Sequence, residues 1–343
     1  MAGALFIGPK WLGDFVMSIP MLRILEQRYG QVDCVLPSYL EPIFHRAGIE
    51  GSIKVLDIVS GEWGWAKRRQ LANKIKPLDK EVAIVLPGSY KSALLPWMAN
   101  IPRRVGYLGE FRYGLLNDIR SNASTRKIKT PYIQQYASLA IEKDEKLEGF
   151  DLVPRLRIDL SEQKKTLEKY NLLSLKKGKR LVICPGAANG KSKRWRSNYI
   201  IQLAKTAFSS GWEVWLMGGK VDVEFVQPML AYLPFIQNLV GKTTLPEAID
   251  LLGTSDVVVA NDSGLMHVAS ALNKPVVAIY GSTHPHWASP QSDHHAIMYA
   301  DLECQPCMKK TCPLKHHHCM TNILPERVFE TIEDLYQREY SNC

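Results

Sequence analysis

The amino-acid sequence predicts an α/β protein built from two Rossmann-like domains that face a central cleft. Three observations lead to this prediction. The chain has 343 residues, a length that suits two domains better than one. Continuous apolar runs of strand length alternate with helical segments, as expected for βαβ units in a parallel sheet. This alternation fills the first half of the chain and returns in the second half with a different sequence.

In the first half, each predicted strand leads into a helix. Ala4–Pro9 is expected to form a strand, and Phe15–Gly30 a helix that ends at its glycine. The stretch QVDCVLPS is the next strand. Glu81–Ala99 repeats the order, with a buried strand, a Pro-Gly-Ser turn and a helix. Because these strands are apolar along their length, we expect helices to cover both faces of the sheet.

A charged segment separates the two halves. Leu152–Lys179 is expected to be an edge segment that connects the domains. The final segment, Leu324–Tyr340, has the pattern of an amphipathic closing helix. The sequence therefore predicts an N-terminal domain over 1–160, a C-terminal domain over 175–325 and a closing helix over 326–343.

Composition narrows the class of partner. Lysine and arginine outnumber aspartate and glutamate by 43 to 34, which gives a net charge of +9 and favours an anionic partner. No apolar stretch reaches the roughly 18 residues that a membrane span needs, and the N-terminus lacks the pattern of a signal peptide. We therefore expect a cytoplasmic protein whose seven cysteines are mostly reduced.

Polar turns follow several of the predicted strands, at the edge where open α/β sheets bind ligands. The first is GPKWLGD. Its glycines, Gly8 and Gly13, allow close approach to the backbone, and Asp14 is a candidate general base. The alternative interpretation of Asp14 is a helix cap. The spacing is not GxGxxG, so a nicotinamide cofactor gains no support.

A second turn, CPGAANGKSKRW, combines small residues with cations. Its small residues, Gly186 among them, expose backbone N–H groups, and four cations add positive charge: Lys191, Lys193, Arg194 and Arg196. Together they suit a phosphate or diphosphate. The spacing is not that of a P-loop. The alternative is a solvated basic turn.

The third turn, NDSGLMH, follows the apolar strand DVVVA. Asp262 and Ser263 are candidate caps of the next helix, whose N–H groups then point at a ligand, and Gly264 removes side-chain bulk where a phosphate approaches. His267 lies one helical turn further along the same face. A structural histidine is the alternative interpretation of this residue.

Two further segments carry charge or metal-binding side chains. Four arginines of the first domain are expected to form a cationic face for an acceptor with phosphate or carboxylate groups: Arg103, Arg104, Arg112 and Arg120. Near the C-terminus, four thiols within sixteen residues resemble a structural zinc site, although not one of common spacing: Cys304, Cys307, Cys312 and Cys319. Disulfide bonds are the alternative, which the expected cytoplasmic compartment disfavours, and the sequence leaves open whether the thiols hold metal.

Several motifs together carry a family resemblance: WLGDFVMSIPMLRIL, FRYGLLNDIR, CPGAANGKSKRW and NDSGLMHVASALNKPVVAIYGSTHP. In these stretches the chain resembles the bacterial ADP-heptose:lipopolysaccharide heptosyltransferases, and RYGLLND favours the type II enzymes. The resemblance implies a GT-B fold and an inverting transfer of heptose from ADP-heptose to the first heptose of Kdo-lipid A. It also implies that no metal or other cofactor is required and that nucleic acid is not a partner.

The same resemblance assigns roles to residues. Asp14 matches the catalytic base, with Gly13 beside it, and Lys193 matches the lysine that neutralises the departing ADP. Further substrate-binding positions are Gly186, Arg194, Asp262, Ser263, Gly264, Leu265 and His267. A glycolipid acceptor places the protein at the anionic inner face of the membrane.

Two alternatives remain at this stage. One is a type I or type III heptosyltransferase, with the same donor and a different acceptor. The other is a non-catalytic nucleotide-binding module that docks a partner through a zinc-dependent cysteine segment.

Overall fold

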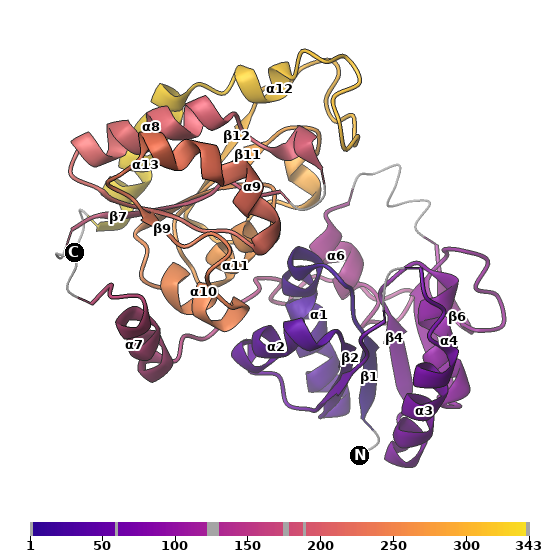
Figure 1. Cartoon of the computed structure of the whole chain (residues 1–343). Coiled ribbons are helices and arrows are strands. Elements are labelled where there is room, and N and C mark those ends of the chain that lie inside the picture. Colours follow the sequence, from indigo (N-terminus) through magenta and orange to yellow (C-terminus); the bar gives the residue numbers. More distant parts are fainter. Residues whose placement is uncertain (1–2, 59–60, 122–129, 174–177, 188–189, 341–343) are drawn as a thin grey trace. The chain divides into compact units, whose positions relative to one another are not determined.

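The computed structural model describes residues 3–58, 61–121, 130–173, 178–187 and 190–340 (Figure 1). The chain divides into two compact units, Met1–Pro154 and Arg155–Cys343. In the described residues each unit contains one parallel sheet of six strands. The predicted α/β class with two Rossmann-like units is therefore confirmed.

The first sheet has the strand order β3-β2-β1-β4-β5-β6. Strands are added on one side of β1 up to β3 and then on its other side from β4 onward, so the strand order reverses between β1 and β4. This is the doubly wound order of Rossmann folds. Figure 1 shows α1 and α6 on one side of the sheet and α3 and α4 on the other. The strands are β1 (Ala4–Ile7), β2 (Val32–Leu36), β3 (Ile53–Val55), β4 (Val82–Val85), β5 (Arg103–Tyr107) and β6 (Asp118–Arg120). The α-helices are α1 (Leu12–Tyr29), α2 (Glu41–Ala47), α3 (Trp65–Ile75), α4 (Tyr90–Met98) and α6 (Tyr132–Ala137).

The second sheet has the order β12-β11-β10-β7-β8-β9, which is the same doubly wound order with its reversal between β7 and β10. Its strands are β7 (Arg180–Cys184), β8 (Glu213–Leu216), β9 (Gln237–Asn238), β10 (Val257–Asn261), β11 (Val276–Tyr280) and β12 (His295–Tyr299). The α-helices are α7 (Leu160–Lys169), α8 (Ser197–Ser209), α9 (Val223–Val226), α10 (Leu245–Leu252), α11 (Gly264–Ala271), α12 (His318–Thr321) and α13 (Pro325–Tyr340). Short 3-10 turns complete the described elements of both units.

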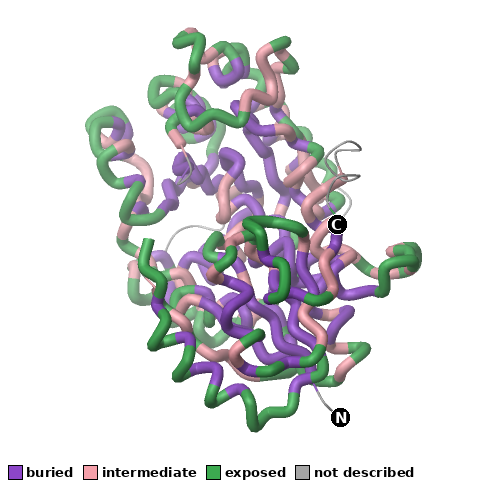
Figure 2. Tube along the Cα trace, turned by 90° about the vertical axis from the view of Figure 1, so that its right-hand side faces the viewer, coloured by how far each residue is buried: buried purple, intermediate pink, exposed green. Residues whose placement is uncertain are grey.

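Local sequence explains these elements. The central strands β1, β4, β10 and β11 are buried at every residue, as their unbroken apolar runs predict (Figure 2). Helix α1 ends at Gly30, whose φ of 76° suits glycine and whose N–H donates to the Glu26 carbonyl. The helix begins at Leu12, three residues before the expected start at Phe15, so Asp14 lies inside its first turn.

From Arg155 on, the described part of the expected connecting segment belongs to the second unit, and residues 174–177 lie outside the described residues. Its helix α7 packs on α10, where Lys169 pairs with Glu247 at 2.5 Å and Gln163 donates to the Asp250 carbonyl at 2.9 Å. The closing helix α13 packs against α8 and contributes Val328 to the core. None of the helices in the described ranges combines the length and apolar character needed to cross a bilayer.

Candidate active site

In the second unit, the turns that follow β7 and β10 meet. These strands are neighbours at the point where the strand order reverses, which is where doubly wound sheets bind ligands. An ion pair joins the two turns, because Lys193 Nζ lies 2.6 Å from Asp262 Oδ2. The sequence placed these residues 69 positions apart in two separate motifs. The fold thus brings together the two turns that the sequence analysis selected.

The Asp262 carboxylate accepts hydrogen bonds from two side chains of the same unit. Besides Lys193, the hydroxyl of Thr283 donates to the same carboxylate oxygen at 2.6 Å, and the Asp262 side chain is only 9% exposed. Lysine carries three N–H donors, so one contact with a carboxylate does not exhaust its ammonium group. This arrangement fixes the ammonium group at the strand ends, and the Lys193 side chain as a whole is 17% exposed.

The preceding residue locks the turn after β7 to β10. The Asn261 side chain accepts a bond from the Trp195 N–H at 3.2 Å and donates to the Pro185 carbonyl at 2.7 Å. Trp195 is buried and its indole N–H donates to the Ile323 carbonyl. Because both ends of the turn are held, Lys193 projects from a fixed backbone.

Gly186 lets the carboxylate of Asp222 lie close to the backbone of the turn after β7. A Cβ on this residue would lie 2.3 Å from Asp222 Oδ2, so no larger residue fits without a shift. Asp222 also accepts from the Gly219 N–H at 3.0 Å and lies 3.5 Å from the Arg194 guanidinium. Burial raises the pKa of Asp222, an effect that the Gly219 N–H and Arg194 oppose. Arg194 is therefore committed in part to Asp222.

The turn after β10 places the remaining predicted residues at the start of α11. Gly264 and Leu265 are its first two residues and are partly exposed. Ser263 occupies the N-cap position, but in the described structure its side chain makes no capping bond, so the expectation of a Ser263 cap is wrong. Asp262 does not cap through the bonds seen here either, because its carboxylate turns to Lys193 and Thr283.

His267 lies inside the unit and is only 5% exposed. Burial lowers its pKa, Asp262 opposes this effect and Lys193 adds to it, and together they bring the pKa from 6.5 to about 4. The imidazole is therefore neutral at pH 7. This burial fits the structural interpretation of His267, and a direct substrate contact stays a prediction.

The lowered pKa of His267 predicts acid-sensitive stability. Between pH 6.5 and about 4 the unfolded histidine binds a proton that the folded one does not, so stability falls as pH falls through this window. We expect this residue to contribute up to ~3 kcal/mol of that loss. Urea unfolding at pH 7.5 and 4.5 checks this, with His267→Gln as the variant that cannot titrate. Equal pH dependence in both proteins would contradict it.

In the first unit, Asp14 lies in the first turn of α1, after β1, and is partly exposed. The hydroxyl of Tyr136, from α6, donates to Asp14 Oδ1 at 2.8 Å. Burial and the Asp14 carboxylate together raise the pKa of Tyr136 well above its usual value, which keeps this hydroxyl a donor. The bond orients one carboxylate oxygen. Trp11 holds the N-cap position, so Asp14 is not the N-cap.

The two glycines near Asp14 differ in environment. Gly13 is the second residue of α1 and is partly exposed. Gly8 is explained by packing, since a Cβ there would lie 2.2 Å from the Leu36 side chain. A ligand is not needed to account for Gly8.

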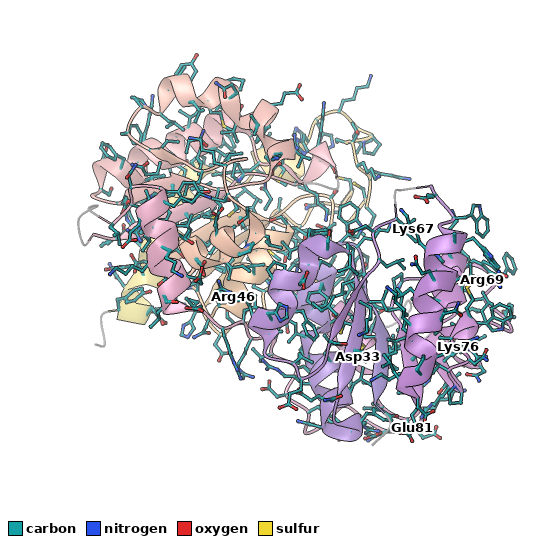
Figure 3. All side chains as sticks on the ribbon, turned by 60° about the horizontal axis from the view of Figure 1, so that its bottom comes forward. Asp33, Arg46, Lys67, Arg69, Lys76 and Glu81 are labelled. Carbon is teal, nitrogen blue, oxygen red and sulfur yellow. The ribbon has the colours of Figure 1, made fainter. Side chains whose placement is uncertain are left out.

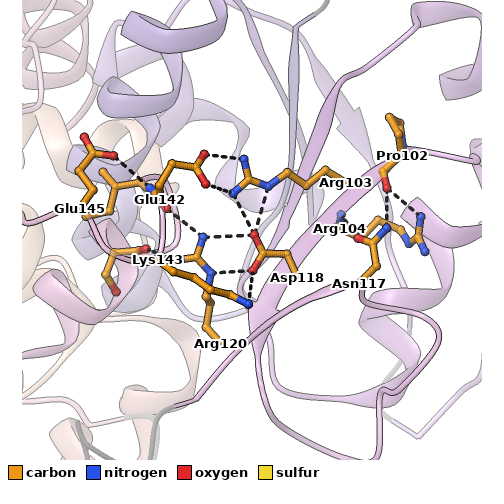
Figure 4. A network of polar contacts seen from close by, with 11 residues as sticks. Pro102, Arg103, Arg104, Asn117, Asp118, Arg120, Glu142, Lys143 and Glu145 are labelled. Atoms are coloured by element: carbon orange, nitrogen blue, oxygen red, sulfur yellow. Dashed lines mark hydrogen bonds and ion pairs between the residues drawn. The ribbon is translucent and has the colours of Figure 1, made fainter.

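The expected cationic face of four arginines is wrong in this form. Asp118 pairs with Arg103 at 2.9 Å and with Arg120 at 2.8 Å, and Arg103 also pairs with Glu142 at 2.6 Å (Figure 4). Arg104 donates to the carbonyls of Leu115 and Ile101. Arg112 is 1% exposed and donates to the carbonyls of Pro87 and Tyr107. These guanidinium groups hold the β5–β6 region together.

The segment 301–319, here called the cysteine lobe, carries the four clustered cysteines. All four are free thiols that line one cavity, together with Ser192 and Ser282. Among the described residues, no group of three or more histidine, cysteine, aspartate and glutamate side chains is arranged to hold a metal ion. The resemblance to a zinc site thus finds no preformed cluster of ligands.

Sequence reasoning assigned no role to Tyr136, Asn261, Thr283 or Asp222. Asn261 and Thr283 lie inside the motif NDSGLMHVASALNKPVVAIYGSTHP, so their position near a strand end was an available signal. Asp222 lies after a Gly-Gly pair that follows β8, a weaker signal of the same kind. Tyr136 comes from a helix more than 120 residues beyond its partner and has no local signal.

Two parallel doubly wound sheets, with a paired cation and carboxylate at one switch point, form the kind of site where α/β proteins bind ligands. The family model described as glycosyltransferase family 9 (heptosyltransferase) matches residues 68–318. The chain therefore belongs to glycosyltransferase family 9, the heptosyltransferases.

Similar proteins support the membership over the whole chain. The chain is 33% identical to lipopolysaccharide heptosyltransferase 2 of Escherichia coli K12, over 98% of this chain and 99% of the relative. It is 35% identical to lipooligosaccharide heptosyltransferase 2 of Haemophilus influenzae, over 96% and 98%. The solved structure of E. coli ADP-heptose lps heptosyltransferase II matches with a TM-score of 0.86 and 32% identity, over 98% of this chain and 99% of that one. The predicted GT-B-like fold and glycosyltransferase class are thus confirmed.

Proposed function

We propose that this enzyme transfers L-glycero-D-manno-heptose from ADP-heptose to the first heptose of the lipopolysaccharide inner core, with inversion at the anomeric carbon. The acceptor is heptosyl-Kdo2-lipid A. The single observation that carries the proposal is the Lys193–Asp262 pair at the switch point of the second sheet, within a chain that matches type 2 relatives from end to end. No metal or other cofactor has a part in the proposed reaction.

On the donor side, the second unit supplies positive charge where a diphosphate leaves. Lys193 presents an ammonium group, and the N-terminus of α11 begins two residues after Asp262. As the bond between the anomeric carbon and the diphosphate breaks, negative charge grows on the departing ADP, and fixed cations stabilise that charge. Gly186, Arg194, Ser263, Gly264 and Leu265 are proposed to contact the donor around this centre.

On the acceptor side, Asp14 is the proposed base. It takes the proton from the acceptor hydroxyl while that oxygen attacks the anomeric carbon. The bond from Tyr136 occupies one carboxylate oxygen and orients the other. Gly13, next to Asp14 in the first turn of α1, adds no side chain that would obstruct the acceptor.

The donor is tested by ADP release. The enzyme is incubated with heptosyl-Kdo2-lipid A and either ADP-heptose, ADP-glucose or UDP-glucose, and the nucleotide product is quantified by chromatography. The proposal expects acceptor-dependent release of ADP from ADP-heptose at a rate far above that with the other two sugars. Preference for another donor, or release without acceptor at the same rate, would contradict it.

Exposed aromatic side chains and cations in the first unit suit contact with an anionic membrane. Trp63 and Trp65 are 56% and 52% exposed, and the Lys91 ammonium lies 4.6 Å from the Trp63 ring centroid. The adjoining helix α3 and the turn after it carry three exposed cations, Lys67, Arg69 and Lys76. Figure 3 shows Arg69 and Lys76 on the same side of this segment. Tryptophan prefers the membrane interface, and cations are attracted to anionic lipid headgroups. We propose that this surface, residues 63–76 with Lys91, rests on the membrane that holds the acceptor.

This surface predicts a binding defect. The variant Trp63→Ala/Trp65→Ala is expected to bind vesicles of phosphatidylglycerol and phosphatidylethanolamine about fivefold more weakly or worse, because two interfacial anchors are lost. Co-sedimentation measures this. Tyr232→Ala is the matched control, since Tyr232 is 60% exposed in the second unit and also has a lysine over its ring. Unchanged binding of the double variant, or an equal loss in the control, would refute the surface.

A further inference from the structure

The cysteine lobe shares a wall with the turn that carries Lys193. The cavity lined by its four thiols is also lined by Ser192, the residue immediately before Lys193, and by Ser282, which follows β11. The Met308 N–H donates to the Ser282 carbonyl at 2.8 Å. The lobe is therefore packed directly against the turns of the proposed donor site.

Every polar group of Ser192 is engaged by the lobe or by Ser282. Its N–H donates to the Lys310 carbonyl at 3.1 Å, and its hydroxyl bonds to the Lys309 carbonyl and lies 2.9 Å from the Ser282 hydroxyl. Its carbonyl accepts a bond from His317 Nε2 at 3.0 Å. Ser192 is 3% exposed. A buried residue with all its polar groups bonded has little freedom to move.

Lys193 stands between two such anchors. The lobe holds Ser192 on one side, and Asn261 holds the Trp195 N–H on the other. Gly190 lets the lobe come close, because its φ is 127° and a Cβ there would lie 2.8 Å from the Lys310 Cα. The position of the Lys193 ammonium thus depends on where the lobe sits.

We propose that the cysteine lobe positions Lys193 for catalysis, with His317 as the main positioning residue, and that covalent modification of the lobe thiols lowers transfer. The inference rests on the proposed function, in which Lys193 stabilises the departing ADP. The segment is thereby a thiol-sensitive control element rather than a substrate contact.

Three thiols of the lobe are the accessible ones among the described cysteines. Cys304, Cys307 and Cys312 are partly exposed, whereas Cys34 and Cys184 are buried. Burial raises the pKa of both buried thiols far above their usual range, and the thiolate is the reactive form. Burial and the neighbouring thiols also raise the pKa of Cys319 to about 11.

N-ethylmaleimide is a suitable probe of this control. A lobe thiolate adds to one alkene carbon of the reagent, which forms an S–C bond, while the adjacent carbon takes a proton from water and nothing leaves. The added ring is larger than the gaps between close-packed side chains, so we expect an adduct that points into the cavity to displace the lobe from Ser192 and Ser282. The loss should appear in kcat, because a shifted lysine acts on the departing group.

The positioning role is tested with three variants assayed for transfer and thermal stability. His317→Ala removes the bond to the Ser192 carbonyl and is expected to lower kcat by about tenfold to a hundredfold, with a small change in the KM for the donor. His317→Gln keeps an N–H at the end of the side chain and should recover most of the rate. The exposed neighbour His318 gives the matched control, and His318→Ala should behave as wild type.

The effect of thiol modification is tested first on the wild-type protein. N-ethylmaleimide should lower kcat of the wild type by a similar factor, and Cys304→Ser/Cys307→Ser/Cys312→Ser should resist the reagent. Wild-type kcat in His317→Ala, or full transfer after complete alkylation of the lobe, would overturn the proposal. Wild-type kcat in Lys193→Ala would instead refute the role of Lys193 itself, which separates the two failures.

Discussion

Replacing Asp14 by asparagine is expected to lower kcat by about a thousandfold, within the range that a positioned general base contributes. Asparagine keeps the size of the side chain and an oxygen that can accept the bond from Tyr136, but it cannot take a proton. ADP binding should survive, because the donor contacts are proposed on the second unit. Steady-state transfer kinetics, together with calorimetric titration of ADP, measure both expectations.

Tyr136→Phe is the matched control for Asp14→Asn. It removes the bond to Asp14 and keeps the carboxylate, so we expect a loss of about tenfold or less. If Asp14→Asn turned over as fast as the wild type, Asp14 would not be the base. A loss in Tyr136→Phe equal to that in Asp14→Asn would make orientation, rather than proton transfer, the limiting contribution.

Replacing Lys193 by alanine is expected to lower kcat by about a hundredfold to a thousandfold, as for the loss of one fixed group that stabilises transition-state charge. The substitution also leaves the buried Asp262 carboxylate with Thr283 as its remaining donor in the bonds described, so a loss of stability should accompany the loss of rate. Thermal unfolding should therefore be measured with the kinetics. Added ADP should stabilise the variant less than the wild type.

The matched control is Lys191→Ala. Lys191 belongs to the same 3-10 turn, two residues earlier, and is exposed. The same charge is removed from the same turn, so kcat within about twofold of the wild type is expected for a solvated cation. Equal losses in Lys191→Ala and Lys193→Ala would mean that the general charge of the turn matters and that the position of Lys193 does not.

Much of the fold was predictable because short stretches of the sequence determine its strands and helix ends. Unbroken apolar runs such as Val257–Ala260 and Val276–Tyr280 have few stable places other than the centre of a parallel sheet. Gly30 likewise marks the end of α1. The start of α1 was missed by three residues, because Gly13 is a poor helix former. The contacts of the connecting segment with Glu247 and Asp250 were not predictable, because they join residues that are distant in sequence.

The site was predictable only where its polar or charged residues directly follow a predicted strand. Lys193 and Asp262 stood out as polar residues in such turns, but their pairing across 69 residues follows from strand order. The prediction of a cationic face from four arginines was wrong, because a count of charges does not reveal that Asp118 and Glu142 pair with Arg103. The role of Ser192 was invisible for the same reason, since its partners come from the cysteine lobe.

The acceptor is the part of the proposed function that one assay decides most directly. The enzyme is given ADP-heptose with Kdo2-lipid A that either carries its first heptose or lacks it. The masses of the glycolipid products are measured by mass spectrometry. The proposal predicts the addition of one heptose to the acceptor that already carries one, and no addition to the other. Addition to the acceptor that lacks heptose, or no addition to either, would contradict it.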